Sequence, residues 1–521
     1  MTCLTPNAAL SGMRKVATSI GLFGLAALCS VKAPAQQIPY LTELLARDEA
    51  VNRLLAEKHR AGANLSGFEP IRLRAEAAFK SGNLPGVLET LGEAISALEG
   101  KPWDERRKFE SSLSLEINRT VIEPNQELQV NLVRMFAADE GKALKAAPTV
   151  TIEAAPVDSG SGAPGKRVTL AEHLMVGQST TIANQKLRLP DGAYNVTATV
   201  EAGGEKIAVL RKALYAVGDF SERIENLKAS AAQIKNSADA RVKAIAGLVA
   251  TPEFQIQRLV VLNQNGDGGA IDAMAELDRI EAALRALLKG DDPFAADRGE
   301  VERAYRSADG QLVPYRVFLP TKYDGKSPLP LIVALHGALG DEQSYFSGLY
   351  DPATIKGELE RRGYIMAAPN GRSRMSTYTG PGDDDVMQVI RSVTAYYKVD
   401  ASRIYLTGHS LGGFGTWLIA ASHADLFAAI APVSGGAPVP PGAVPALLAK
   451  LKDVLVVVVH GAKDGIVPPD NSRRMVASAK QAGLKVTYIE VPDADHISVV
   501  GPSFPSILDF FDKASKQTAA H

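Results

Sequence analysis

Cysteine is nearly absent from this 521-residue sequence, which contains two, Cys3 and Cys29. Both lie in an N-terminal segment, residues 1–35, and the rest of the chain has none. A chain without cysteine can form no disulfide and no thiolate metal site, and it cannot use cysteine as a nucleophile. Any covalent chemistry downstream of residue 35 must therefore rely on another residue type.

A long hydrophobic run is also missing, apart from residues 16–30 in the N-terminal segment. This run follows Arg14 and Lys15 and is shorter than a membrane span requires. A signal-peptidase pattern, Ala33-Pro34-Ala35, comes next. We therefore expect residues 1–35 to be a signal peptide of an exported protein, periplasmic or extracellular, with no stable membrane insertion after cleavage. An uncleaved anchor, or a lipid attached at Cys29, is the alternative.

The sequence also lacks an excess of either charge, because it contains 57 Lys and Arg residues and 58 Asp and Glu residues. A net charge of −1 gives no electrostatic reason to expect nucleic acid or an anionic membrane as a partner. The one acidic run, residues 383–385, lies at a predicted helix start, where the helix dipole favours acids. We expect no metal and no cofactor, and the sequence leaves the oligomeric state open.

The spacing of apolar residues divides the remaining chain into four parts. Residues 36–110 have helical spacing and predict a helical module. Residues 111–218 alternate apolar and polar positions between turn signals, which predicts a β-sandwich of immunoglobulin-like type. Residues 219–297 return to helical spacing and predict a helical connector. In residues 298–521 predicted strands alternate with helices, as in a mostly parallel sheet with helices on both faces.

The sequence Gly408-His409-Ser410-Leu411-Gly412 has the G-x-S-x-G pattern of a nucleophile elbow. A β-branched and aromatic run, residues 403–407, precedes it, and a helical pattern, residues 413–421, follows it. A sharp turn between a strand and a helix exposes the serine hydroxyl at the helix N-terminus, where backbone N–H groups can stabilise an oxyanion. The chain contains 45 glycines, so a chance match is the alternative, but the flanking strand and helix favour a nucleophile.

The last roughly 220 residues resemble the α/β-hydrolase fold. They are most similar to secreted esterases that include feruloyl esterases and polyhydroxybutyrate depolymerases, with dienelactone hydrolases and prolyl oligopeptidases as further relatives. The resemblance covers less than half of the chain, and four motifs carry it: His336-Gly337-Ala338, Gly408 to Gly412, His460 to Asp464, and Asp495-His496.

This resemblance implies a catalytic triad in the order Ser, acid, His. Ser410 is the predicted nucleophile, Asp464 follows the predicted strand 454–459, and His496 follows the last predicted strand, 485–491. His496 would act as the general base, and Asp464 would orient its imidazole. The competing acids are Asp470, Asp493 and Asp495, and the competing histidines are His336, His409, His423 and His460. A packing role is expected for His336 and His460, because each ends a buried strand.

Backbone N–H groups of Leu411 and Ala338 would form the oxyanion hole. Tyr345 could contact a substrate, although solvent-side packing accounts for it equally well. Trp417 is expected to lie in the core, with a place in the wall of the substrate pocket as the alternative. The segment where cap insertions often occur, residues 434–453, is short and rich in Pro and Gly, which predicts an open, shallow pocket.

The sequence therefore predicts an exported serine hydrolase that cleaves small-molecule or polymeric carboxylic esters through an acyl-enzyme. A serine peptidase of prolyl oligopeptidase type is one alternative, although no repeat with the period of a propeller blade is visible. A non-catalytic binding protein on a hydrolase scaffold is the other, and the presence of all three triad residues argues against it.

Overall fold

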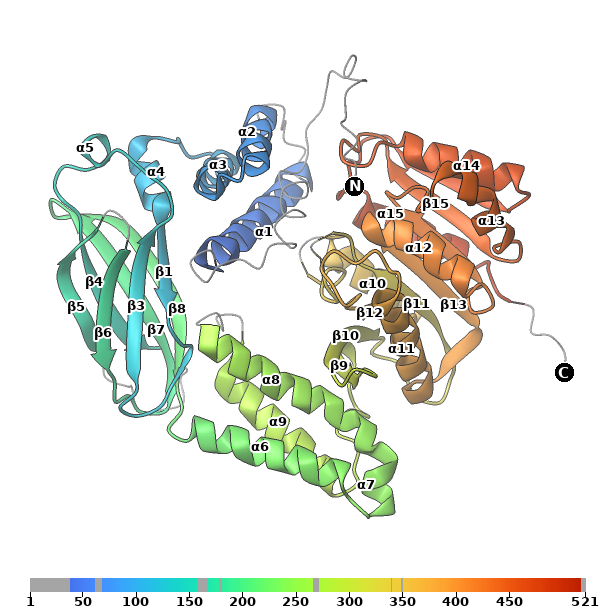
Figure 1. Ribbon diagram of the computed structural model, residues 1–521, viewed down its shortest axis with the longest axis horizontal. Helices are drawn as coiled ribbons and strands as arrows, with labels where there is room; N and C mark the ends of the chain where they lie inside the picture. Colours follow the sequence, from blue (N-terminus) through green and yellow to red (C-terminus); the bar gives the residue numbers. More distant parts are fainter. Residues whose placement is uncertain are drawn as a thin grey trace, which may run out of the picture.

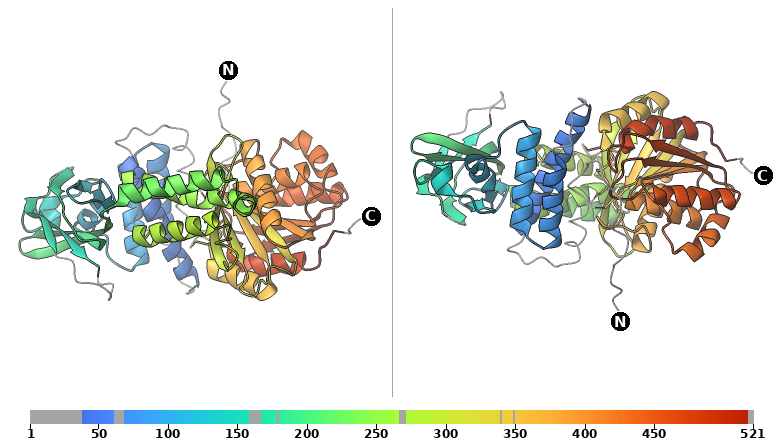
Figure 2. Two further views of the ribbon diagram at one scale, coloured as in Figure 1. Left: turned by 90° about the horizontal axis from the view of Figure 1, so that it is seen from below. Right: turned by 90° about the horizontal axis from the view of Figure 1, so that it is seen from above.

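A computed structural model describes residues 38–60, 68–157, 167–177, 180–265, 271–338, 340–347 and 350–516. The predicted signal peptide and its cleavage site lie outside these residues. The two-sheet region occupies one end of the elongated molecule and the C-terminal region the other (Figures 1 and 2). Helices from two separate parts of the chain lie between these ends: α1–α3, within residues 38–98, and α6–α9, within residues 220–288.

The first helices pack around a small apolar core of their own. Leu44, Val51, Leu88 and Leu91 contribute to this core. Helix α3 begins after Asn83, whose side-chain oxygen accepts a hydrogen bond from Gly86 N at 3.1 Å and so caps the helix. The helices are α1 (Ile38–Arg60), α2 (Glu69–Lys80), α3 (Leu84–Leu98) and α4 (Glu105–Ser112).

Two sheets, in the orders β1-β3-β6 and β2-β8-β7-β4-β5, follow these helices and share one apolar core. Burial alternates along β3 and β7, as the period of two predicts. The immunoglobulin-like type of this region stays a prediction. The elements are β1 (Leu113–Ile117), β2 (Val121–Ile122), β3 (Glu127–Arg134), α5 (Glu140–Ala143), β4 (Thr149–Pro156), β5 (Val168–Met175), β6 (Thr180–Lys186), β7 (Gly192–Ala202) and β8 (Glu205–Ala216).

The connector consists of helices that form a third core. An apolar stripe on α9, which includes Leu277, Ile280, Leu284 and Leu287, packs against α6 and α8 within the connector. The stripe therefore does not cover the C-terminal region. The elements are α6 (Phe220–Lys235), α7 (Ala240–Ile245), the 3₁₀ helix η4 (Ala246–Val249), α8 (Ala250–Asn265) and α9 (Ala273–Leu288).

Helix α8 joins the two ends of the molecule. Near its C-terminus, the Asn263 side chain accepts hydrogen bonds from Thr120 N and Val121 N at 3.1 and 2.8 Å. Near its N-terminus, Thr251 Oγ1 accepts a hydrogen bond from Ala304 N at 3.1 Å. Helix α8 therefore contacts both regions.

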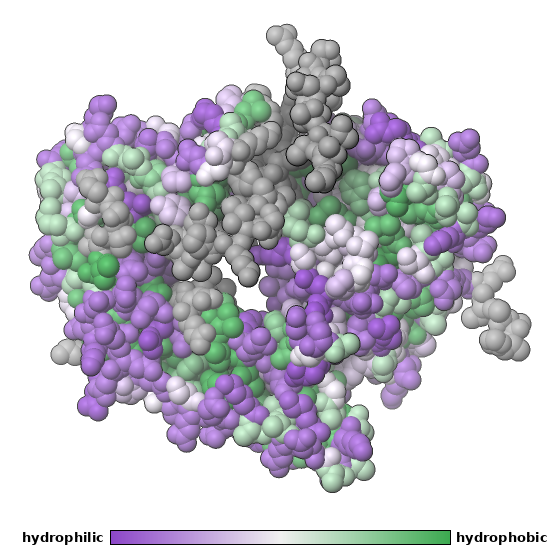
Figure 3. Space-filling view, in the orientation of Figure 1, coloured by the Kyte–Doolittle hydropathy of each residue, from purple (hydrophilic) through white to green (hydrophobic). Residues whose placement is uncertain are grey.

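The segment Ala240–Asn263 is long and apolar enough, by composition alone, to span a membrane. Within it, however, Arg258 pairs with Glu276 and Glu302, and α8 packs on α6, α9, β9 and β10. These contacts identify it as a packing helix between protein surfaces. The face of the molecule shown in Figure 3 is mostly hydrophilic, with apolar residues interspersed.

The C-terminal region contains an eight-stranded sheet in the order β16-β15-β14-β13-β11-β12-β10-β9. Strands β11 to β16 are parallel, whereas β9 and β10 pair antiparallel at one edge. The strands are β9 (Gly299–Arg306), β10 (Leu312–Leu319), β11 (Leu329–Leu335), β12 (Ile365–Pro369), β13 (Val399–His409), β14 (Ala429–Val433), β15 (Leu455–Gly461) and β16 (Val486–Val491).

Helices cover both faces of this sheet, each over its own apolar core. The predicted mostly parallel sheet with helices on both faces is therefore confirmed, and β9 is a strand that the sequence did not predict. The helices are α10 (Pro352–Arg362), α11 (Pro381–Tyr396), α12 (Leu411–Ser422), η6 (Pro441–Ala443), α13 (Val444–Ala449), α14 (Asp470–Gln481) and α15 (Val500–Phe511).

Residues just before the predicted boundary at Arg298 pack on the C-terminal region. Asp292 accepts a hydrogen bond from Tyr396 OH at 2.6 Å, and Asp297 pairs with Arg303 at 2.7 Å. The Arg303 guanidinium also lies 4.3 Å from the centroid of the Phe294 ring. A boundary before Asp292 preserves these contacts.

A fragment that starts at Asp291 is therefore expected to be more stable than one that starts at Arg298. The shorter fragment leaves the buried Arg303 without its carboxylate, which costs on the order of 1–3 kcal/mol. Thermal unfolding of both fragments tests this, and the longer fragment should cleave small esters at rates close to those of the full chain. Equal melting temperatures would contradict the assigned boundary. A folded but inactive longer fragment would instead place part of the site upstream.

Candidate active site

Ser410 occupies a strained turn between β13 and α12. Its φ of 58° and ψ of −117° lie where residues other than glycine are rarely found. Two glycines make the turn possible. A Cβ at Gly412 would lie 2.2 Å from Leu335 O, and a Cβ at Gly408 would lie 2.3 Å from Gly412 O. The predicted strand, turn and helix are therefore present, and they hold Ser410 at the helix N-terminus.

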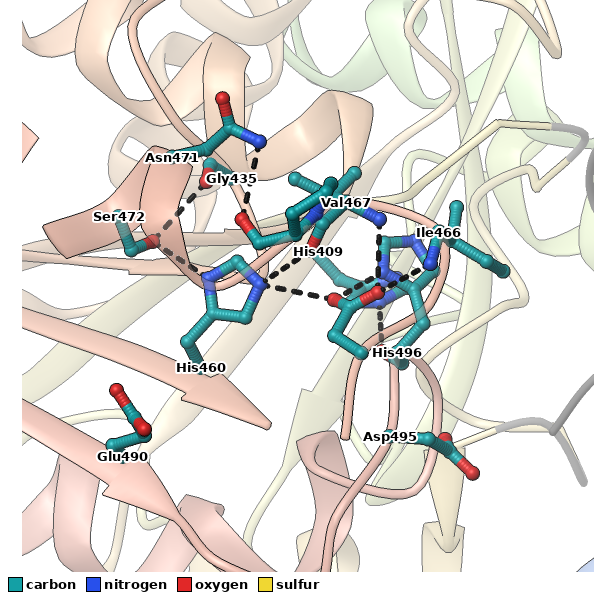
Figure 4. Close-up of polar contacts among 12 residues, drawn as sticks. His409, Gly435, His460, Ile466, Val467, Asn471, Ser472, Glu490, Asp495 and His496 are labelled. Carbon is teal, nitrogen blue, oxygen red and sulfur yellow. Dashed lines mark hydrogen bonds and ion pairs between the residues drawn. The ribbon is translucent and has the colours of Figure 1, made fainter. Parts of the chain in front are cut away.

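Asp464 and His496 meet at the carboxyl end of the same sheet. Asp464 lies in the loop after β15 and His496 in the loop after β16, and His496 Nδ1 is 2.7 Å from Asp464 Oδ2. The other carboxylate oxygen accepts hydrogen bonds from Ile466 N at 2.9 Å and Val467 N at 2.8 Å. The loop backbone thus fixes the carboxylate with one oxygen directed at the imidazole. Figure 4 shows Ile466, Val467 and His496 around this point.

The Asp464 carboxylate stays ionised despite its burial. Burial alone would raise the pKa of Asp464, but hydrogen bonds from His460 and His496 outweigh it and hold the pKa well below its usual range. An ionised carboxylate accepts the Nδ1 proton of His496, so this tautomer leaves Nε2 unprotonated. That Nε2 atom is buried and has no hydrogen-bond partner.

His409 ties the Ser410 turn to the His496 loop. Its Nε2 lies 2.6 Å from His496 O, its Nδ1 lies 2.9 Å from Tyr350 OH, and the two imidazoles are 4.6 Å apart. The carbonyl requires a proton on Nε2, so Nδ1 accepts from Tyr350. Burial lowers the pKa of His409 well below its usual value, which keeps the ring neutral. The ring of His496 therefore lies beside the residue that precedes Ser410.

The loop that contains Ala338 passes close to Ser410. A Cβ at Gly337 would lie 3.2 Å from Ser410 Cβ. The preceding His336 holds this loop, with Nδ1 2.7 Å from Gly337 O and Nε2 2.8 Å from Asn370 O. Leu411 is the first residue of α12, so its N–H has no partner within the helix. Both predicted oxyanion donors thus lie on segments next to the nucleophile.

Tyr345 and Trp417, the two predicted substrate contacts, are each 1% exposed. Tyr345 packs on Tyr350 with ring centroids 4.9 Å apart, and Trp417 belongs to the core under α12. Both side chains therefore pack inside the protein, and a contact of either with a substrate stays a prediction.

The competing acids have other partners. Asp470 pairs with Arg473 and Asp493 pairs with Lys463, each at 2.7 Å. Asp495 accepts hydrogen bonds from the backbone N–H groups of Ile497 and Ser498, both at 2.9 Å, and so stabilises the turn after His496.

The acidic run 383–385 does not converge on one point. Asp383 contacts His423 at 2.8 Å, whereas Asp385 is buried and accepts hydrogen bonds from Tyr305 OH and Gly371 N. Burial raises the pKa of Asp385 to about 6. Among the residues that the structure describes, no group of three or more His, Cys, Asp or Glu side chains could hold a metal ion.

His460 is the residue of this site that sequence reasoning missed. A packing role was expected, but its Nε2 lies 3.0 Å from Asp464 Oδ2, the oxygen that also contacts His496. The signal in the sequence was the motif His460 to Asp464, which carries part of the resemblance and places the histidine four residues before the acid. Spacing alone does not show that the two side chains meet, because the conformation of the loop after β15 decides this.

Comparison with known proteins gives a family match and several relatives. Residues 359–438 match the prolyl oligopeptidase family. The chain is 29% identical over 244 residues to a bifunctional acetylxylan esterase/xylanase of Neocallimastix patriciarum, covering 41% of this chain and 35% of that protein. It is also 29% identical over 137 residues to feruloyl esterase B of Talaromyces funiculosus, covering 24% and 37%.

The chain thus spans little more than a third of the length of these two relatives. A solved structure of a feruloyl esterase module from Clostridium thermocellum, in complex with sinapinate, is 18% identical, with a TM-score of 0.36. It covers 43% of this chain and 91% of that module. The sequence matches, the sheet order and the strained serine turn agree with one another. The C-terminal region of this chain is similar to esterases of the α/β-hydrolase family.

Proposed function

We propose that this chain is an exported serine hydrolase that cleaves carboxylic esters through an acyl-enzyme on Ser410. The observation that supports the proposal is the strained turn at Ser410, together with the contact of the adjacent His409 with the loop of the His496–Asp464 pair. In this mechanism His496 Nε2 takes the proton of the Ser410 hydroxyl as the oxygen attacks the ester carbonyl. The same nitrogen then returns that proton to the leaving alcohol.

The rest of the mechanism uses the groups around this triad. Asp464 stabilises the imidazolium that forms at His496, and the N–H groups of Leu411 and Ala338 stabilise the oxyanion. Water then attacks the acyl-enzyme, with His496 again as the base. No step requires a metal or a cofactor.

The relatives suggest which esters to test first. Their names include feruloyl esterase and acetylxylan esterase, so we propose aryl-carboxylate and acetyl esters, free or on a polymer, as substrates. Export rests on the N-terminal sequence pattern alone. The role of the upstream regions is proposed to be the positioning of bulky substrates, because every residue of the proposed chemistry lies downstream of residue 298.

A serine peptidase is the second candidate, favoured by the match of residues 359–438 to the prolyl oligopeptidase family. The upstream described residues form helices and two sheets of three and five strands, an arrangement unlike a propeller.

A matched panel of substrates separates the two candidates. The purified protein should cleave short-chain nitrophenyl esters and leave the corresponding nitroanilides and prolyl peptides intact. Release of nitrophenol and nitroaniline is followed by absorbance under identical conditions. Preferential cleavage of the anilides would favour the peptidase, and cleavage of neither substrate would contradict the proposed function.

A further inference from the structure

The Asp464 carboxylate has a second imidazole partner. His460 is the next-to-last residue of β15, and its side chain is 0% exposed. Figure 4 shows its ring beside Ser472. On the other side of the ring, Nε2 lies 3.0 Å from Asp464 Oδ2. A histidine buried this completely must find partners for both ring nitrogens, and the identity of those partners determines where its proton lies.

The partners of His460 place its proton on Nε2. This nitrogen lies 3.0 Å from Asp464 Oδ2 and 2.8 Å from Val467 O, and both oxygens can only accept. The other nitrogen, Nδ1, lies 2.7 Å from Ser472 Oγ. The Ser472 hydroxyl also lies 3.1 Å from Gly435 O, and its single proton can serve only one of these two partners. A proton on Nδ1 instead would direct an Nε2 lone pair at a carboxylate and a carbonyl, which is repulsive.

With this tautomer, His460 fixes both the carboxylate and the loop that contains it. Asp464 Oδ2 accepts from two imidazoles, and Oδ1 accepts from two backbone N–H groups. The contact with Val467 O holds the loop three residues beyond Asp464. Without His460, Oδ2 would keep only His496, the partner that moves between neutral and charged states during the proposed reaction.

We propose that His460 is a positioning residue of the site, whose Nε2–H holds the Asp464 carboxylate in the orientation that His496 requires. The inference rests on the proposed function, because positioning matters for turnover only if Asp464 and His496 act as acid and base partners. His460 itself does not touch the substrate or the reacting atoms.

Two substitutions separate positioning from packing. His460→Phe keeps a planar buried ring and removes the donor, so kcat for a nitrophenyl ester should fall roughly 10- to 100-fold. KM should change less than about twofold, because the substrate is not contacted. His460→Gln retains an amide N–H donor at a similar distance from the backbone and should recover most of the lost kcat. His423→Phe, which removes an outlying histidine, is the matched control and should retain wild-type kinetics.

Two results would overturn the proposal: a His460→Phe variant that keeps wild-type kcat, or a His460→Gln variant as impaired as His460→Phe. A second measurement reads the protonation of His460 in the wild-type protein and uses a variant only to identify the resonance. In ¹⁵N-histidine-labelled full-length protein, NMR should show a proton on His460 Nε2, with its resonance identified by its loss in His460→Gln. The Nδ1–H tautomer would overturn the proposal. This readout does not depend on catalysis, so it would stand or fall separately from the ester hydrolase assignment.

Discussion

Ser410→Ala should lower the turnover of short-chain aryl esters by about 10⁴- to 10⁶-fold, the usual loss when a triad nucleophile is removed. The substitution deletes only the hydroxyl. The Ser410 N–H bond to Val433 O at 3.0 Å and the glycines around the turn are unaffected. The fold should therefore persist, which circular dichroism and thermal unfolding can verify alongside initial rates.

Ser434→Ala is the matched control for this prediction. Ser434 is also a buried serine with a positive φ, 48°, and its hydroxyl has no hydrogen-bond partner. Its removal should leave turnover within a few-fold of wild type. If Ser410→Ala kept a tenth of the wild-type rate, Ser410 would not be the nucleophile.

Asp464→Asn should lower turnover by roughly 10⁴-fold without changing substrate preference. The N–H groups of Ile466 and Val467 require an oxygen at the Oδ1 position, so the new amide NH₂ must face His496. Two donors would then oppose each other, and His496 must move its proton to Nε2. A protonated Nε2 cannot accept the serine proton. Steady-state kinetics on two esters of different acyl length measures both the rate and the preference.

Asp495→Asn is the control for the acid, because Asp495 is adjacent to His496 but bonds only to the turn backbone. An asparagine side-chain oxygen can accept the same two hydrogen bonds, so little activity should be lost. If Asp464→Asn retained full turnover and Asp495→Asn did not, the assignment of the acid would be reversed.

The nucleophile turn could be predicted from sequence because its determinants are local. A strand, two glycines and a helix within a few residues leave one conformation for Ser410. The positions of Asp464 and His496 could be inferred because strand ends in a parallel sheet lie at one edge. His460 could not be assigned, since His336 and His460 both end buried strands before glycine. Only the loop after β15 makes one of them a partner of the carboxylate.

The periodicity of apolar residues predicted the helices and strands of the upstream regions. It did not predict which elements contact the C-terminal region. Helix α9 has the clearest apolar stripe, and it packs within the connector. The contact with the C-terminal region is made by α8 through polar groups, including Thr251 and Arg258. Strand β9 was missed because charged residues such as Glu300, Glu302 and Arg303 occupy it and bind partners on neighbouring elements. Hydrophobic patterns carry no signal of such polar contacts.

The central claim is that Ser410 is the reactive nucleophile of an ester hydrolase. It is tested most directly by labelling the purified full-length protein with a fluorophosphonate and mapping the adduct by peptide mass spectrometry. Our account predicts one adduct, on Ser410, formed in step with the loss of esterase activity. An adduct on another residue, or full esterase activity after complete labelling of Ser410, would contradict it.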